Sequence, residues 1–205
     1  IIFQDISFDE VQLSKETKKL IQITLDKKSN NFIIFKDLLI ENKQFSKSYA
    51  KPEDISLILY TSGTTGNPKG VPRTHLAERS SAMAHVAQNL YERYESTLGV
   101  MPLYHTMGVR SLLAMSLVNG RFVVQPKFSA SETLNLIENF KITSLYLVPT
   151  LFHDLIEFSS FNKERVISCK KLGFAGASMT SGLIKKIRNN FNAKYLVNHY
   201  GSSEI

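Results

Sequence analysis

The sequence predicts an α/β fold of layered, mostly parallel sheets flanked by helices, and three observations support this. From Ile55 onward, short β-branched or apolar runs alternate with longer amphipathic stretches, which is typical of βαβ units. With 43% hydrophobic and 21% charged residues, the 205-residue chain has enough apolar side chains for an ordinary core, which excludes a disordered or collagen-like class. The chain shows neither an internal repeat nor a heptad array, which argues against a solenoid or coiled coil.

Six apolar runs in the region after the first fifty residues have the composition of strands. In chain order, the expected strands cover residues 55–60, 98–101, 121–125, 143–148, 171–175 and 194–198.

Local signals predict a helix after several of these strands. Thr74 has the character of an N-cap, and the apolar residues after it recur on one face, so we expect a helix that reaches about Tyr94. A buried helix is expected over 108–118, because Asn119-Gly120 supplies a helix stop.

Three further helices are expected in the second half of the chain. Ser129 and Glu132 have the spacing of a capping box ahead of an apolar stripe. Pro149 suits the first turn of a helix, because it lacks the N–H that would be unsatisfied there. The last helix is expected over about 182–191.

The N-terminal region has a different pattern, with helix-like periodicity over 11–20, a short strand over 32–35 and a polar, linker-like segment over 42–52. We therefore divide the chain into an N-terminal segment with its linker, residues 1–52, and a core, residues 53–205.

Charge and cysteine content exclude several classes of protein. The chain carries 25 Lys+Arg against 18 Asp+Glu, a net charge of +7, but its lysines come as separated pairs that predict solvated faces and no nucleic-acid site. The single cysteine, Cys169, excludes an intramolecular disulfide framework and a Cys-ligated metal site, and we expect it to be inert. No apolar stretch reaches the roughly 20 residues of a membrane span, and no signal peptide is recognisable, so we expect a cytoplasmic protein.

The most informative segment runs from Tyr60 to Gly70, with the sequence Tyr-Thr-Ser-Gly-Thr-Thr-Gly-Asn-Pro-Lys-Gly. Its small residues allow a tight turn in which amide N–H groups and hydroxyls converge on anionic oxygens, and Lys69 adds a positive charge. It is not a Walker A loop, because Lys69 follows a proline and precedes a glycine, with no Ser/Thr after it. The segment predicts a polyphosphate site of another kind.

This segment resembles the phosphate-binding signature of the adenylate-forming, AMP-binding enzymes, which include acyl-CoA and aryl-CoA ligases, luciferases and peptide-synthetase adenylation domains. Three further segments resemble family elements in the expected order: Pro102-Leu-Tyr-His105, Phe174-Ala-Gly-Ala-Ser-Met179 and Tyr200-Gly-Ser-Ser-Glu204. Within the family, the resemblance is closest to ligases of the 4-chlorobenzoate-CoA ligase type or to medium-chain acyl-CoA ligases. It implies that the chain is a fragment of the large N-terminal domain and lacks the C-terminal lid domain.

The resemblance also implies roles for individual residues. The phosphates of ATP would be held by Thr61, Ser62, Gly63, Thr64, Thr65, Gly66 and Lys69, and Glu204 would bind Mg²⁺. The adenine and its surroundings would be contacted by Gly176, Ala177, Ser178, Asn198, Tyr200, Gly201, Ser202 and Ser203, the last standing where the family usually has Thr. His105 would act beside the α-phosphate, and the acyl pocket would be lined by His105, Thr106, Met107, Tyr146 and Val148. The remaining histidines, His75, His85, His153 and His199, are interpreted as structural or surface residues.

Three functions stay open at this point. The favoured one is an ATP-dependent carboxylate–CoA ligase that forms an acyl adenylate and pyrophosphate and then a CoA thioester, with the carboxylate, ATP and CoA as its small-molecule partners. The second is a peptide-synthetase-type adenylation domain, although no Asp that could anchor an amino group lies between Met107 and Leu147. The third is a non-catalytic basic binding module.

Overall fold

The computed structural model describes residues 2–3, 15, 23–25, 33–38, 49–62 and 67–204. The chain divides into two compact units, Ile1–Tyr49 and Ala50–Ile205.

The first unit contains a small parallel sheet in the order β1-β2-β3. Its strands are β1 (Ile2–Phe3), β2 (Ile23–Thr24) and β3 (Ile33–Ile34), and a 3₁₀ helix, η3 (Phe35–Leu38), follows β3. β3 confirms the strand predicted over 32–35. The helix predicted over 11–20 and most of the linker predicted over 42–52 lie outside the described residues.

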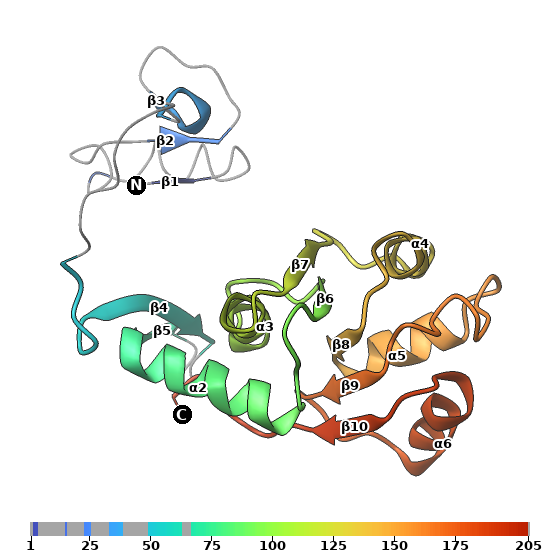
Figure 1. Cartoon of the computed structure of the whole chain (residues 1–205). Coiled ribbons are helices and arrows are strands. Elements are labelled where there is room, and N and C mark those ends of the chain that lie inside the picture. Colours follow the sequence, from blue (N-terminus) through green and yellow to red (C-terminus); the bar gives the residue numbers. More distant parts are fainter. Residues whose placement is uncertain are drawn as a thin grey trace. The chain divides into compact units, whose positions relative to one another are not determined.

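The second unit is built on a five-stranded sheet in the order β10-β9-β8-β6-β7, with every pair parallel (Figure 1). Its strands are β6 (Ser96–Gly99), β7 (Arg121–Val124), β8 (Ser144–Leu147), β9 (Lys171–Phe174) and β10 (Tyr195–Asn198). These strands confirm the predicted parallel sheet. β6 begins and ends two residues earlier than the predicted strand over 98–101. Its bounds are set by its pairing with β7, which runs from Ser96 opposite Arg121 to Gly99 opposite Val124.

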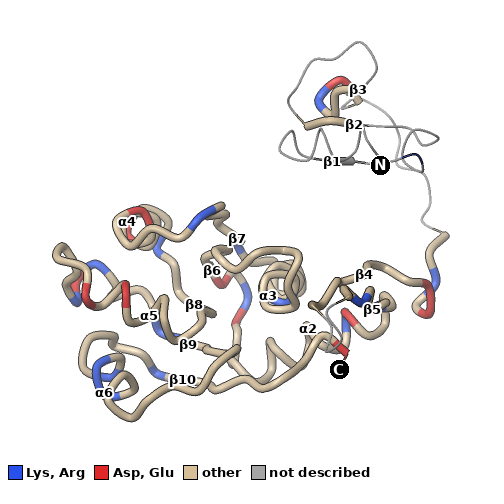
Figure 2. The backbone as a smooth tube through the Cα atoms, turned by 180° about the vertical axis from the view of Figure 1, so that it is seen from behind, with Lys and Arg blue, Asp and Glu red and all other residues tan. Residues whose placement is uncertain are grey.

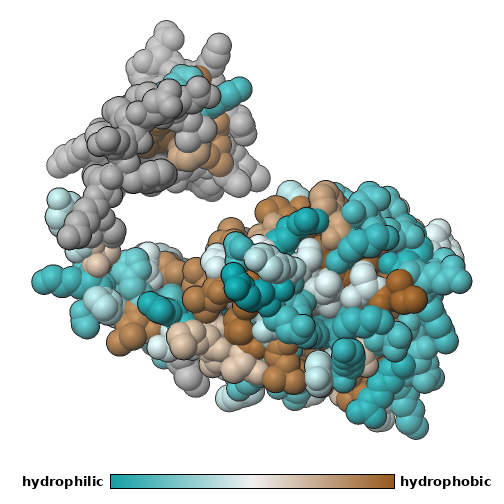
Figure 3. All heavy atoms as spheres, viewed as in Figure 1, coloured by the Kyte–Doolittle hydropathy of each residue, from teal (hydrophilic) through white to brown (hydrophobic). Residues whose placement is uncertain are grey.

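Helices cover both faces of this sheet (Figure 1). On one side lie α2 (His75–Gln88) and α3 (Thr106–Leu117), and on the other lie α4 (Ala130–Phe140), α5 (Pro149–Ile156) and α6 (Ser181–Asn190). The main core lies between the sheet and α4–α6, where Leu134, Phe152 and Ile187 have no exposed surface. The outer surface over these three helices is largely hydrophilic (Figure 3).

Helix α2 begins where the sequence predicts and ends earlier. The Thr74 hydroxyl accepts a hydrogen bond from the backbone N–H of Ala77 at 3.1 Å, which confirms the predicted N-cap. The helix ends at Gln88, so the predicted end near Tyr94 is wrong: Leu90 (φ 51°) and Tyr94 (φ 68°) are left-handed and cannot continue a right-handed helix.

The first predicted strand does not belong to the parallel sheet. β4 (Ile55–Thr61) pairs antiparallel with β5 (Lys69–Thr74) in a separate two-stranded hairpin, here called the β4–β5 arm. The expectation of a βαβ unit starting at Ile55 was therefore wrong. β5 escapes sequence reasoning because its sequence, Lys-Gly-Val-Pro-Arg-Thr, has no apolar alternation and contains Pro72.

Basic and acidic residues alternate over many elements of the unit (Figure 2), as the separated lysine pairs predict. Among the described members of the lysine pairs, Lys171 differs, because it is buried on β9 and forms ion pairs with Glu95 and, at 3.0 Å, with Glu92. The prediction of a solvated face is wrong for this lysine. Although burial opposes its charged form, hydrogen bonds from its ammonium group to the two carboxylates raise the pKa of Lys171.

Candidate functional site

The segments that follow the parallel strands meet at the carboxyl edge of the sheet, the usual place for a ligand crevice in such a fold. A cavity of about 420 Å³ opens at this edge. Its lining comes from α2, the start of α3, and the segments after β6, β8, β9 and β10: Ser81, Ala84, His85, Gln88, Met101, His105, Thr106, Met107, Arg110, Tyr146, Val148, Ala175, Gly176, His199, Tyr200, Gly201 and Ser202.

The structure brings together nine of the predicted site residues. His105, Thr106, Met107, Tyr146, Val148, Gly176, Tyr200, Gly201 and Ser202 all line this one cavity. They come from four separate segments of the chain, so only the fold makes them neighbours. Ala177, Ser178 and Asn198 are described but are not among the lining residues.

The two ends of the glycine-rich segment belong to the β4–β5 arm: it begins in β4 and finishes in β5. Thr61 pairs with Lys69 at the end of the hairpin, and Ser62 follows Thr61. The predicted phosphate-binding residues Gly63, Thr64, Thr65 and Gly66 lie outside the described residues. The arm therefore carries a hydroxyl, that of Thr61, and the amine of Lys69 on paired residues of its two strands.

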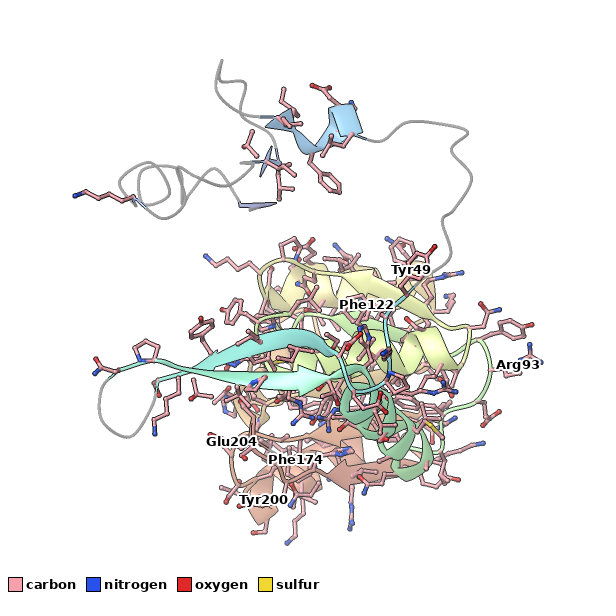
Figure 4. The ribbon with its side chains drawn as sticks, turned by 90° about the vertical axis from the view of Figure 1, so that its left-hand side faces the viewer. Tyr49, Arg93, Phe122, Phe174, Tyr200 and Glu204 are labelled. Atoms are coloured by element: carbon pink, nitrogen blue, oxygen red, sulfur yellow. The ribbon has the colours of Figure 1, made fainter. Side chains whose placement is uncertain are left out.

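The base of the arm is joined to the Tyr200–Glu204 segment by Arg73. Its Nη1 donates a hydrogen bond to the backbone oxygen of Ser203 at 3.2 Å. Tyr200 and Glu204 lie on the flank from which the arm extends (Figure 4). Two motifs separated by more than a hundred residues in the sequence are thus adjacent.

Glu204 is an exposed carboxylate held in its charged form. A hydrogen bond from Ser202, a backbone hydrogen bond and the positive charge of Lys69 lower the pKa of Glu204. The influence of Lys69 shows that the arm's lysine and this carboxylate share one electrostatic environment. An ionised carboxylate of this kind is a hard oxygen ligand.

His105 occupies the N-cap position of α3, directly after the Pro-Leu-Tyr segment. Its backbone oxygen accepts from Val109 N–H at 3.2 Å, while its own N–H donates to the oxygen of Pro102 at 3.1 Å. The close turn depends on Gly108, where a Cβ would lie 2.2 Å from the oxygen of Pro102. The backbone thus holds His105 at the cavity mouth, where its side chain is exposed.

Tyr200 also lines the cavity and is 97% exposed, so its ring is free to stack on a planar ligand. Gly176, after β9, has a φ of +83°, a conformation that favours glycine, and its missing side chain leaves space beside Val148. The aromatic face of Tyr200 and the open backbone at Gly176 are both suited to contact with a flat heterocycle.

Sequence reasoning did not place His85 and His199 in the cavity, where they form a polar wall with the predicted residue Tyr146. His85 on α2, Tyr146 on β8 and His199 after β10 pack together, with ring centroids 4.8–5.0 Å apart. Burial lowers the pKa of His85 to about 3, with smaller contributions from His199 and Arg110, and burial likewise lowers the pKa of His199. Both imidazoles are therefore neutral near pH 7 and serve as hydrogen-bonding groups of the lining.

The position of His199 directly after a predicted strand is the one sequence signal that could have placed it at this edge. For His85, no such signal exists, because its role depends on which face of α2 meets the sheet. His75 and His153 are exposed, as expected for surface residues.

Two of the predicted exclusions can be examined in the described part of the chain. Cys169 is fully buried and its thiol donates toward the oxygen of Ile142 at 3.4 Å; burial raises the pKa of Cys169 to about 12, which supports the expected inertness. Among the described residues, no cluster of three His, Cys, Asp or Glu side chains has the geometry of a metal site. Nor does any described helix combine the length and apolar character needed to cross a membrane.

The arrangement of the arm, the exposed tyrosine and the cavity agrees with the sequence comparisons. The profile of the AMP-binding enzyme family matches residues 3–205. The chain belongs to the AMP-binding enzyme family. The recognition made from the four motifs is therefore confirmed.

Three AMP-binding relatives illustrate the similarity. The 4-chlorobenzoate–CoA ligase of Pseudomonas sp. (strain CBS-3) is 33% identical over 168 residues, which are 80% of this chain and 32% of that protein. The chloroplastic/peroxisomal 2-succinylbenzoate–CoA ligase of Arabidopsis thaliana is 34% identical over 154 residues, 74% of this chain and 28% of that protein. The structure of a luciferase-like enzyme from the mealworm Zophobas morio superposes with a TM-score of 0.81 at 26% identity, covering 100% of this chain and 49% of the other. The chain thus spans about a third of the length of these curated relatives.

Proposed function

We propose that the protein is an ATP-dependent carboxylate–CoA ligase: it joins a carboxylic acid to AMP, releases pyrophosphate and then transfers the acyl group to CoA. The observation that carries the proposal is the single cavity that joins His105, Gly176 and Tyr200 at the carboxyl edge of the sheet, beside the arm that carries Lys69. A cavity of about 420 Å³ is within the range of small-ligand sites.

Each group of residues around the cavity would have a separate role in forming the acyl adenylate. An attacking carboxylate and the α-phosphate of ATP repel each other, so the site has to bring them into line and offset their charge. Tyr200 and Gly176 would bind the adenine between an aromatic face and open backbone. Thr61, Ser62 and Lys69 would contact the outgoing phosphates, and His105 would bind at the mouth where the two reacting groups meet.

The charged Glu204 carboxylate fits Mg²⁺, which is held in such sites by one or two carboxylates together with phosphate oxygens. Glu204 would hold the ion, and the ion, when bound, would supply positive charge to the phosphates. Among the described residues, Lys69 supplies a positive charge that helps to lower the pKa of Glu204.

The acyl group would occupy the inner part of the cavity, beside Met107, Tyr146 and Val148. The lining contains no Asp or Glu among the described residues, so it offers no anchor for the ammonium group of an amino acid. This favours a CoA ligase over a peptide-synthetase-type adenylation domain. Basic and acidic residues are interspersed along the backbone (Figure 2), and this distribution does not favour the non-catalytic basic binding module.

The test is carboxylate-dependent exchange of labelled pyrophosphate into ATP by the complete gene product, across aryl, aliphatic and amino acids, with and without CoA. Exchange with an aryl or aliphatic acid, followed by thioester formation on addition of CoA, is the expected result. Glu204→Gln should lower the exchange rate by about 100-fold, as expected for a lost interaction with transition-state charge. The matched control is Glu164→Gln, on the exposed segment before Arg165. Absence of exchange with every acid, or exchange with amino acids alone, would overturn the proposal.

A further inference from the structure

Arg110 is the one side chain with a permanent charge among the described residues that line the cavity. It lies on α3, four residues and therefore about 6 Å along the helix axis beyond Thr106. The lining contains no carboxylate to balance it. An AMP-binding site for a plain hydrocarbon acid has no evident need for a cation there, because such pockets are predominantly apolar.

The guanidinium group of Arg110 is incompletely satisfied. Its Nε is buried and has no hydrogen-bond partner among the described residues, and burial lowers the pKa of Arg110. Buried charge is costly unless an opposite charge or hydrogen bonds compensate it. The group therefore has unused hydrogen-bonding capacity for a ligand.

Glu78 compensates the charge of Arg110 only in part. Glu78 acts on Arg110 electrostatically, but its Oε1 accepts a hydrogen bond from Nε of Arg73 at 2.6 Å. Glu78 and Arg73 are both buried, so this pair is already engaged.

The groups around Arg110 suit an acceptor-rich ligand. His85 and His199 are neutral because burial lowers their pKa values, so they add hydrogen-bonding capacity to this wall without a further charge. Gln88 and the hydroxyl-bearing Tyr146 line the same cavity. Together these side chains form a polar wall around a single cation.

We propose that Arg110 binds a second anionic group on the acid substrate, so that the preferred substrates carry a carboxylate or sulfonate in addition to the carboxylate that is adenylated. This inference rests on the proposed ligase function. The planar fork of the guanidinium group would bind the second anion with two parallel hydrogen bonds, and the arm's Lys69 would remain available for the phosphates.

The test compares matched diacids and monoacids in the pyrophosphate-exchange assay of the complete gene product. The pairs are the three benzene dicarboxylates against benzoate, and succinate, glutarate and adipate against butyrate, valerate and hexanoate. We expect the wild type to show a higher kcat/KM for one diacid than for its matched monoacid. Arg110→Met should reduce the diacid-to-monoacid ratio by about 10- to 100-fold, the effect of losing a charged hydrogen bond.

Arg110→Lys keeps the charge and loses the fork, so it should retain part of the preference. Arg188→Met, on the exposed side of α6, is the matched control and should leave the ratio at its wild-type value. Equilibrium dialysis of the preferred diacid should show the same weakening with Arg110→Met.

Two results would overturn this inference while the ligase function stands. The first is a wild-type preference for monoacids. The second is an equal loss for both substrate classes in Arg110→Met together with a raised KM for ATP, which would place Arg110 at the reacting carboxylate or the phosphates. Absence of exchange with every acid would instead overturn the ligase function, and this inference with it.

Discussion

Arg73 and Glu78 form a buried ion pair, with Nε and Oε1 separated by 2.6 Å and each side chain at most 7% exposed. The pair joins the end of β5 to the first turn of α2. Because the same arginine also donates to the backbone oxygen of Ser203, it links the arm, the helix and the Tyr200–Glu204 segment. The β4–β5 arm, α2 and the Tyr200–Glu204 segment are therefore held together by one shared side chain.

Replacing Glu78 with Ala should destabilise the 205-residue chain by about 3–5 kcal/mol, because it leaves Arg73 buried without its carboxylate. Urea unfolding measures this loss. Glu164→Ala, at an exposed position, is the control and should change the free energy of unfolding by less than about 0.5 kcal/mol. A loss below about 1 kcal/mol in Glu78→Ala would show that the ion pair is not needed to hold these elements together.

Lys171 and Glu95 form a second buried pair, between β9 and the residue before β6. Lys171→Met should cost about 3–5 kcal/mol, since the carboxylate of Glu95 loses its buried counter-charge. Adding Glu95→Gln to that variant should recover part of the loss, because the uncompensated charge is then removed as well. Lys163→Met, on the exposed loop before β9, is the control. Equal losses in the single and double variants would contradict this account.

His85 makes the stability of the fold depend on pH. Its pKa of about 3 lies below the ordinary value of 6.5, so between these pH values the unfolded chain binds a proton that the folded chain does not. Stability from this residue is therefore complete above about pH 6.5 and is lost as the pH falls toward 3. The slope is at most about 1.4 kcal/mol per pH unit.

The measurement is the free energy of unfolding of the wild type and His85→Gln at pH values from 8 to 4.5. The difference between the two should be constant above pH 6.5 and should shift in favour of the variant as the pH falls. Parallel curves over the whole range would show that folding leaves the pKa of His85 unchanged and would contradict this account.

Gly108 should resist substitution. A Cβ at this position would lie 2.2 Å from the oxygen of Pro102 and 2.5 Å from that of Met101, and both atoms belong to the backbone. Gly108→Ala should therefore cost about 1–3 kcal/mol and lower pyrophosphate exchange by displacing His105. Gly182→Ala in α6 is the matched control, because a Cβ there meets nothing within 4 Å. It should be neutral or stabilising by up to about 1 kcal/mol, and similar behaviour of the two variants would contradict the packing argument.

The sequence alone was sufficient for the family, the parallel sheet and most of the elements. The N-caps at Thr74 and Ser129 and the Pro149 helix start are local features, because each depends on residues only a few positions apart. The four motifs are local in the same sense, which is why five of their residues, His105, Gly176, Tyr200, Gly201 and Ser202, could be named before their common cavity was known.

Only the tertiary structure decided the end of α2, the antiparallel pairing of β4 with β5 and the polar wall of the cavity. Each of these depends on contacts that residue spacing does not reveal: β5 becomes a strand because it pairs with β4, and beyond the end of α2 the backbone N–H of Tyr94 donates to the oxygen of Val118. The burial of Lys171 likewise depends on its ion pair with Glu95. His85, Arg110 and His199 lie 25 residues or more apart in the chain and become one polar wall only when α2, α3 and the end of β10 pack around the same edge of the sheet. Residue spacing in the sequence indicates local periodicity only. The packing of the helices against the sheet determines which helix faces line the same cavity.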